Sequence, residues 1–115
     1  MRGRVKQGER SDRRRHPRFA FDGPLVLTTE DATVVLGRTL DISVAGLGGL
    51  LVSGPWTAGA LVKLELPIQE DIASLNLSAI VRSRSGNRCG FEFVDVTAAE
   101  NDLIRRACET LDLLE

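Results

Sequence analysis

A run of arginine residues near the N-terminus carries the groups best suited to binding an anion. Residues 13–15 are all arginine and Arg18 follows, so that Arg14 and Arg18 form an R-x-x-x-R motif. Pro17 disfavours a helix here, and we expect an extended segment that directs several guanidinium groups at one ligand. A guanidinium group donates two parallel hydrogen bonds to a phosphate or to the O6/N7 edge of guanine. The motif predicts a site for such a ligand, although basic N-terminal runs are also often simply solvated.

A second short motif, residues 41–46, combines a carboxylate, a hydroxyl and a glycine. In an extended chain Asp41 and Ser43 lie on the same face, so both can contact one ligand. A carboxylate accepts hydrogen bonds from the N–H groups of guanine, and a serine hydroxyl donates to a phosphate or a base. Gly46 allows a backbone conformation or a close approach that a Cβ atom would block. The alternative interpretation is a turn whose polar side chains cap the backbone without any ligand.

The charge distribution confines an anion site to the N-terminal segment. Residues 1–18 hold eight basic and two acidic residues, a net charge of +6, whereas the rest of the chain holds seven basic and fourteen acidic residues, a net charge of −7. Aromatic residues are scarce, with four Phe, one Trp and no Tyr. The acidic body and the few aromatic rings argue against a nucleic-acid-binding surface. We expect Trp56 to pack in the core or at its rim.

The other reactive residues form no catalytic or metal-binding pattern. Cys89 and Cys108 lie far apart with only one histidine in the chain, so a zinc site lacks ligands and reduced thiols are expected. Ser43, Asp41 and His16 can be imagined as a triad, but the G-x-S-x-G elbow is missing. No apolar stretch approaches ~18 residues, and the N-terminus lacks the apolar region of a signal peptide. These observations predict a cytoplasmic protein that is neither an enzyme nor a membrane-spanning protein.

Short apolar runs separated by turn residues predict strands that position the two motifs. Residues 61–66 and 75–84 alternate between apolar and polar side chains, which is typical of half-buried strands. Residues 22–24 (Asp-Gly-Pro) are expected to break the first strand. The predicted strands are 25–28 with 19–21 as an extension, 33–41, 46–53, 61–66, 75–84 and 89–94.

A single helix is predicted near the C-terminus. Thr97 and Glu100 form a capping box, which marks a helix start. The apolar stripe expected to pack on the barrel contains Leu103, Ala107, Leu111 and Leu114. The fold class is therefore dominated by β-structure: a six-stranded antiparallel β-barrel with one C-terminal α-helix. We expect residues 1–12 to be a flexible basic arm and residues 13–115 to be the barrel domain.

The order of these features resembles the PilZ domain family, whose fold is a split barrel of this kind. The resemblance covers residues 13–114 and rests on the R-x-x-x-R motif, the D-x-S-x-x-G motif of residues 41–46, the strand count, the closing helix and Gly90–Phe93. It implies a bacterial receptor for the second messenger cyclic di-GMP. The ligand-binding residues that it implies are Arg13, Arg14, Arg18, Asp41, Ser43 and Gly46.

The resemblance also implies how such a receptor acts. Arg14 and Arg18 would clamp guanine and phosphate, and Arg13 would add a contact that favours an intercalated dimer of the ligand. Binding would order the N-terminal arm and signal to a partner protein that the sequence does not identify. Two other classes stay open: a ligand-independent adaptor that acts through protein–protein contacts, and a basic arm that binds nucleic acid.

Overall fold

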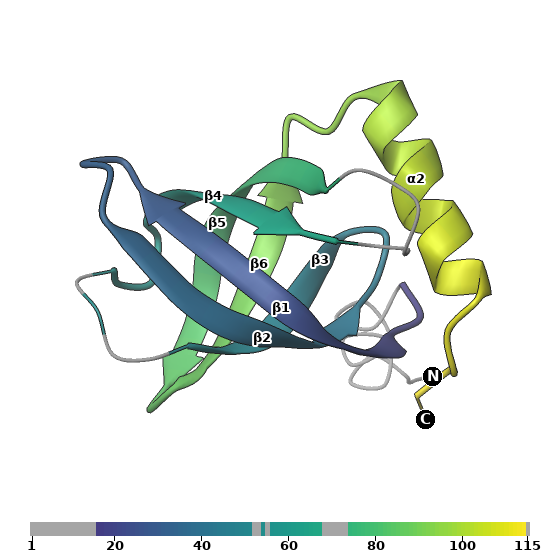
Figure 1. Cartoon of the computed structure of the whole chain (residues 1–115), viewed down its shortest axis with the longest axis horizontal. Coiled ribbons are helices and arrows are strands. Elements are labelled where there is room, and N and C mark those ends of the chain that lie inside the picture. The colour runs from purple at the N-terminus through teal and green to yellow at the C-terminus, as the bar shows by residue number, and fades with distance from the viewer. Residues whose placement is uncertain (1–15, 52–53, 55, 68–73, 115) are drawn as a thin grey trace, which may run out of the picture.

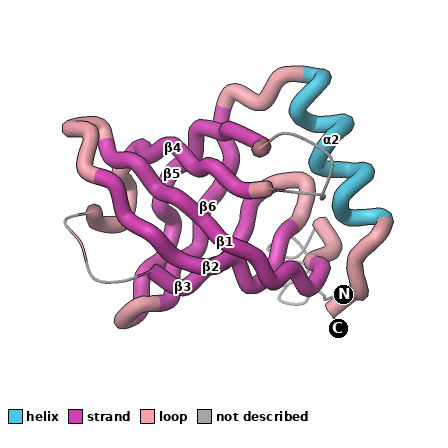
Figure 2. Tube along the Cα trace, viewed as in Figure 1, coloured by secondary structure: helices cyan, strands magenta, loops and turns pink. Residues whose placement is uncertain are grey.

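The computed structural model describes residues 16–51, 54, 56–67 and 74–114 of the 115-residue chain. These residues form a closed barrel of six antiparallel strands with one helix beside it (Figures 1 and 2). Around the barrel the strands follow the order β1-β2-β3-β6-β5-β4, and β1 pairs with β4 to close it. The predicted fold class is confirmed. The elements are β1 (Phe19–Thr29), β2 (Val34–Ile42), β3 (Gly46–Leu51), β4 (Leu61–Leu66), β5 (Leu75–Ser85), β6 (Arg88–Val94) and α2 (Ala98–Glu109).

Alternating side chains fill the barrel. In β4 the residues Val62, Leu64 and Leu66 are buried while the residues between them are exposed, as their alternation predicts. Trp56 is only 2% exposed and belongs to the core, which confirms its predicted packing role. The guanidinium group of Arg84 lies 4.3 Å from the centroid of the indole ring and covers it.

The first strand runs through the predicted break at residues 22–24. Pro24 pairs with Arg38 of β2, and the register shifts between Ala20 and Gly23. Because β4 pairs only with the stretch from Val26 onward, no second strand needs an N–H group at Pro24. The prediction of a break was wrong because Pro24 has a neighbouring strand on one side only. The β-bulge absorbs the irregularity instead.

The helix begins as the capping box predicts. The Thr97 hydroxyl accepts a hydrogen bond from the Glu100 N–H at 3.1 Å, and the Glu100 carboxylate accepts one from the Thr97 N–H at 3.0 Å. The buried face consists of Ile104, Ala107 and Cys108. Only Ala107 of the predicted stripe is fully buried there, and Leu103 packs partly against the core.

The end of the helix corrects the rest of that stripe. Helix α2 stops at Glu109, so Leu111 and Leu114 lie outside it, although Leu111 still packs partly against the core. The Ala20 N–H then donates to the Asp112 carbonyl and the Leu114 N–H to the Arg18 carbonyl, both at 2.8 Å. The final residues therefore run along the start of β1 (Figure 1), and the Leu114 side chain is 45% exposed. A helical periodicity cannot hold for a segment whose backbone pairs like a strand.

The hairpin of β5 and β6 is tight, because only Gly86 and Asn87 separate the two strands. Gly86 has φ +62°, in the left-handed region that glycine adopts without strain. Within the described ranges, no helix has the length and apolar character needed to cross a membrane.

Candidate functional site

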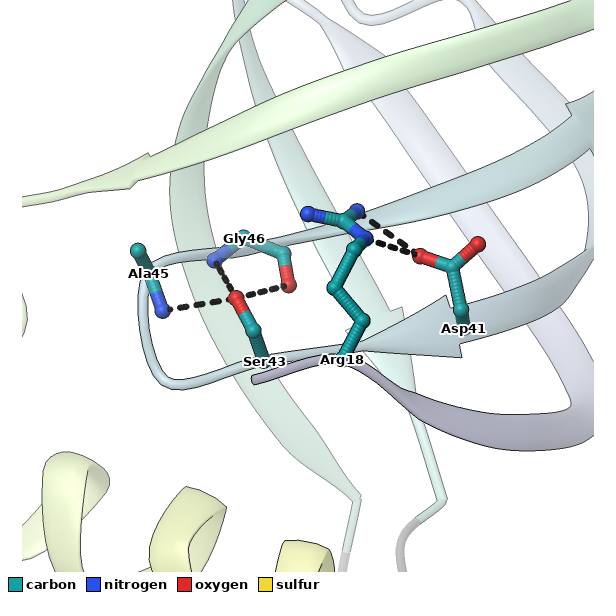
Figure 3. A network of polar contacts seen from close by, with 5 residues as sticks. All are labelled: Arg18, Asp41, Ser43, Ala45 and Gly46. Carbon is teal, nitrogen blue, oxygen red and sulfur yellow. Dashed lines mark hydrogen bonds and ion pairs between the residues drawn. The ribbon is translucent and has the colours of Figure 1, made fainter. Parts of the chain in front are cut away.

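One residue from each of the two sequence motifs takes part in an ion pair beside the start of β1. Arg18 immediately precedes β1, and Asp41 near the end of β2 pairs with Ala20 of β1. The Nε and Nη2 atoms of Arg18 both donate hydrogen bonds to Oδ1 of Asp41, at 3.0 and 2.7 Å (Figure 3). The Asp41 side chain is 12% exposed and the Arg18 side chain 40%. The structure thus joins two predicted site residues in one partly buried ion pair.

A β-bulge in β2 turns Asp41 to the outside of the barrel. Thr39 pairs with Gly49 and Asp41 with Gly48, so Leu40 is an extra residue between consecutive partners on β3. Thr39 is fully buried. The extra residue reverses the alternation of side chains. Asp41 therefore shares the outer face with Gly48, whereas an unbroken alternation would direct both Thr39 and Asp41 into the core.

Gly48 provides the space that the Asp41 carboxylate occupies. A Cβ atom on Gly48 would lie 3.1 Å from each carboxylate oxygen, closer than most such contacts. On the other flank, the β1 partner Ala20 is also small. The carboxylate consequently lies against the backbone of β3, with the Arg18 guanidinium group as its hydrogen-bond donor. The sequence reasoning missed Gly48, whose only signal is its place in the glycine-rich stretch 46–49.

Ser43 closes the turn between β2 and β3. The Ser43 hydroxyl oxygen accepts hydrogen bonds from the N–H groups of Ala45 at 3.1 Å and Gly46 at 3.2 Å (Figure 3). The backbone N–H of Ser43 donates to the Gly46 carbonyl at 2.8 Å. Ser43 is buried. This is the turn interpretation that the sequence left open beside ligand binding. A ligand contact by Ser43 stays a prediction.

Gly46 allows β3 and β6 to approach closely. A Cβ atom at Gly46 would lie 2.0 Å from the Phe91 carbonyl oxygen, so any other residue would push the strands apart. The predicted close approach is confirmed, although the neighbour is another strand of the barrel. A contact between Gly46 and a ligand stays a prediction.

Most of the remaining predicted residues fall outside the part of the chain that the structure describes. Arg13, Arg14 and the predicted arm, residues 1–12, lie outside the described residues. His16 is exposed.

The far end of β1 has a different character. The turn from Thr29 to Thr33 holds Asp31, whose carboxylate accepts hydrogen bonds from both threonine hydroxyls and from the Thr33 N–H. The hydroxyl of Thr29, followed by the groups of Thr33, lowers the pKa of Asp31 below its ordinary value. A cavity of about 240 Å³ lies beside this turn and is lined by residues 29–31, 56–57 and 60–62. None of the described residues that line it is basic, so they offer no cation to an anionic ligand.

Comparison with known proteins identifies similar sequences and folds. The PilZ domain family model matches residues 12–110. No curated protein matches the chain. A structure of the PilZ domain of YcgR from Escherichia coli with c-di-GMP has a TM-score of 0.72 and 19% identity, covering 86% of this chain and 91% of that chain.

Two further solved structures show the same fold. The PilZ domain of CeSA from a cellulose-synthesizing bacterium has a TM-score of 0.67 and 18% identity, covering 81% of this chain and 95% of that chain. The inhibitor of motility MotI/DgrA of Bacillus subtilis has a TM-score of 0.71 and 19% identity, covering 85% of this chain. The chain spans only 50% of the length of MotI/DgrA.

Proposed function

Since the chain belongs to the PilZ domain family, we propose that it is a receptor for cyclic di-GMP, which binds beside the Arg18–Asp41 pair. The observation that carries this proposal is the contact between the two motifs. Arg18 and Asp41 lie 23 residues apart in the sequence and are joined by two hydrogen bonds. The YcgR domain of the same fold contains this ligand in its structure.

The chemistry of the ligand suits the groups at this position. Cyclic di-GMP carries two phosphate charges and two guanine edges that accept hydrogen bonds from arginine. Arg18 lies just before β1 with a partly exposed guanidinium group, and Arg13 and Arg14 precede it by a few residues in the sequence. Ser43 and Gly46 shape the adjoining turn. We assign the ligand contacts at this position to the three arginines. The turn that contains Ser43 and Gly46 supports the site.

The mode of action is part of the same proposal. Cyclic di-GMP, as a monomer or an intercalated dimer, orders the N-terminal arm against the barrel, and a partner protein reads the ordered surface. The arm and the arginine motif together have the charge for this role, since residues 1–18 carry a net charge of +6 while the rest of the chain carries −7. A cytoplasmic location, where the messenger is available, belongs to this proposal.

Calorimetric titration of the full chain with cyclic di-GMP tests the receptor function. We expect saturable binding with a micromolar or lower Kd, about −8 kcal/mol or stronger. GMP and cyclic AMP should compete poorly, because one lacks the second guanine and the other lacks guanine altogether. An Arg14→Ala/Arg18→Ala double variant that still binds would place the ligand elsewhere.

Two results would favour other functions. The Arg18–Asp41 pair forms without any ligand, so a folded chain that shows no binding would point to a ligand-independent adaptor. Affinity for a nucleic acid that falls steeply with salt, through release of counterions, would instead point to the basic arm as a polyanion-binding element.

A further inference from the structure

The outer face of strands β1 and β2 carries apolar side chains that the described part of the chain leaves uncovered. Val34 and Leu36 of β2 are 59% and 64% exposed, and Leu50 on the neighbouring strand β3 is 41% exposed. Helix α2 lies at one end of the barrel and does not run across β1 or β2 (Figure 1). We propose that this face is the interface of a homodimer, in which it packs against the same face of a second copy of the chain around a two-fold axis. The proposal goes beyond the receptor function and does not depend on it.

The register of β1 against β2 gathers the central side chains of this face into two adjacent rows. Val26 of β1 pairs with Leu36 of β2, and Thr28 pairs with Val34. Each of the four alternates with buried neighbours in its strand, so all four point outward from the barrel. We call these four residues the β1–β2 face. Apolar side chains that are exposed together on neighbouring strands mark an interaction surface, whereas exposed apolar residues scattered singly do not.

The closed barrel restricts how a partner can bind this face. Around the barrel each of the six strands has a neighbour on both sides, so none of them is the edge of a sheet. An edge strand is the usual template for backbone pairing between chains. Association at the β1–β2 face therefore uses side chains.

The charges beside the face favour a second copy of the same chain as the partner. On β4, Lys63 pairs with Thr28 and Glu65 pairs with Val26, and both charged side chains are exposed. Neither forms an ion pair with a described residue. The two opposite charges thus flank the two rows of the face, one beside each row. A two-fold axis that crosses the strands between the rows places Lys63 of each copy opposite Glu65 of the other.

The same two-fold operation brings the apolar side chains together. Leu36 lies in one row and Val34 in the other, so Leu36 of each copy lies opposite Val34 of the other. An isologous interface has to be complementary to itself. The β1–β2 face with its flanking charges meets this condition, since apolar groups lie opposite apolar groups and positive charges lie opposite negative charges. A uniformly basic or acidic partner would match only one of the two charges on β4.

The small extent of the face sets the expected strength of the dimer. Stable interfaces bury about 800 Å² of each partner and use roughly 20–30 residues a side. The β1–β2 face and its flanking residues on β3 and β4 are fewer than this. We therefore expect a weak dimer, with a Kd on the order of a few hundred micromolar.

Sedimentation equilibrium of the full chain without ligand tests the proposal. The concentration is varied from about 10 μM to about 1 mM, on either side of the expected Kd. Low ionic strength keeps the ion pairs unscreened. The weight-average mass should rise with concentration from that of the monomer towards twice that value. A mass that stays monomeric over the whole range would overturn the proposal, and the face would then await a different protein.

Polar substitution locates the interface. Leu36→Ser should weaken the dimer about tenfold or more, because a two-fold interface loses the apolar contact twice. Leu113→Ser is the matched control, since Leu113 is 57% exposed and lies beside Phe19, outside the face. It should change the Kd by less than about twofold. Val34→Ser tests the same contact independently, and circular dichroism confirms that each variant is folded. A dimer that both Leu36→Ser and Val34→Ser leave intact would use another surface and overturn the proposal.

Exchange of the two charges on β4 tests the two-fold arrangement itself. Lys63→Glu and Glu65→Lys each place like charges opposite one another and should weaken the dimer about fivefold or more. The double variant Lys63→Glu/Glu65→Lys restores opposite charges across the axis, so its Kd should return to within about twofold of the wild-type value. Arg82→Glu changes the net charge as Lys63→Glu does, but on β5, and should leave the Kd within about twofold. Single reversals without effect, or a double variant as weak as the single ones, would overturn the proposal.

Discussion

Two arginine–aspartate pairs join the segment at β1 to β2, and they differ in their surroundings far more than in their bonds. In each pair the Nε and Nη2 atoms of arginine donate to one aspartate oxygen. The Arg38 and Asp22 side chains are 57% and 79% exposed, whereas those of Arg18 and Asp41 are 40% and 12% exposed. An exposed pair contributes little because water solvates both charges equally well. The Asp41 carboxylate is mostly buried, so its stability depends on the hydrogen bonds from Arg18.

The difference arises from the backbone around each aspartate. Asp41 follows a β-bulge and faces Gly48, whose missing side chain leaves room for a carboxylate close to the sheet. Asp22 lies inside the irregular stretch of β1 between Ala20 and Gly23 and projects into solvent. The same two residue types therefore form a partly buried ion pair at one position and a surface contact at the other. Each of the following experiments changes one member of this comparison.

The largest expected difference is in ligand affinity. Arg18→Ala should weaken binding of cyclic di-GMP by about ten- to a hundredfold, the loss of a charge-assisted contact of roughly 1.5–3 kcal/mol. Arg38→Ala should change the Kd by less than about twofold, because its guanidinium group belongs to an exposed pair that includes no residue of the two motifs. Calorimetry on both variants provides the measurement. Similar losses from the two variants would mean that the ligand responds to total charge rather than to the placed arginine.

The second difference is in the stability of the free protein. Arg18→Ala leaves the Asp41 carboxylate largely buried without its donor, and should lower the free energy of unfolding by about 1–2 kcal/mol after allowance for partial exposure. Arg38→Ala should change it by less than about 0.5 kcal/mol. Urea unfolding followed by circular dichroism measures both values. A loss for Arg38→Ala as large as for Arg18→Ala would contradict the role given to burial.

A smaller effect should follow from crowding the buried carboxylate. Gly48→Ala places a Cβ atom 3.1 Å from both Asp41 oxygens, so the carboxylate and its arginine must shift by a few tenths of an ångström. We expect about threefold weaker binding of cyclic di-GMP, measured by calorimetry. In the Asp41→Ala background the same change should have no further effect, because the crowded group has gone. A loss that persists there would assign Gly48 a direct contact with the ligand.

The smallest effect concerns a third carboxylate, Asp31, which is held by neutral hydroxyls instead of an arginine. Thr29→Val removes the main cause of its lowered pKa, so the pKa of Asp31 should rise toward its ordinary value while ligand affinity stays unchanged. A lowered folded-state pKa contributes stability above the unfolded pKa, and this contribution is lost as pH falls through the folded pKa. The variant should therefore lose less stability in acid. An NMR titration of the Asp31 side chain that shows no change would contradict the hydrogen bond from Thr29.

Local patterns in the sequence predicted most of the elements. Strand alternation located β4 to the residue, and the capping box at Thr97 located the start of α2. Periodicity failed beyond Glu109, because pairing of the last residues with β1 overrides the helical spacing of their leucines. The turn role of Ser43 was one of two interpretations, since a serine two residues after an aspartate suits a turn as well as a ligand.

Local sequence patterns could not predict the contact at the centre of the site. The two motifs could be recognised separately, but the bond between Arg18 and Asp41 depends on the register of β1 against β2 and on two β-bulges. A bulge inserts one residue and reverses the faces of all that follow, and no residue type marks its place. Gly48 was missed for the same reason, since its role exists only once it lies opposite Asp41.

The pairing of the last residues with the first strand has a consequence for the order in which the protein is made. The Arg18 carbonyl accepts its hydrogen bond from the N–H of Leu114, so a residue at the beginning of the domain obtains this partner from a residue near its end. A ribosome adds residues in sequence, at about 5–20 per second, and the arginine motif emerges early. The backbone beside Arg18 acquires this bond only after almost the whole domain has been translated. Ligand recognition of the kind proposed here is thus a property of the finished chain, not of its nascent N-terminal part.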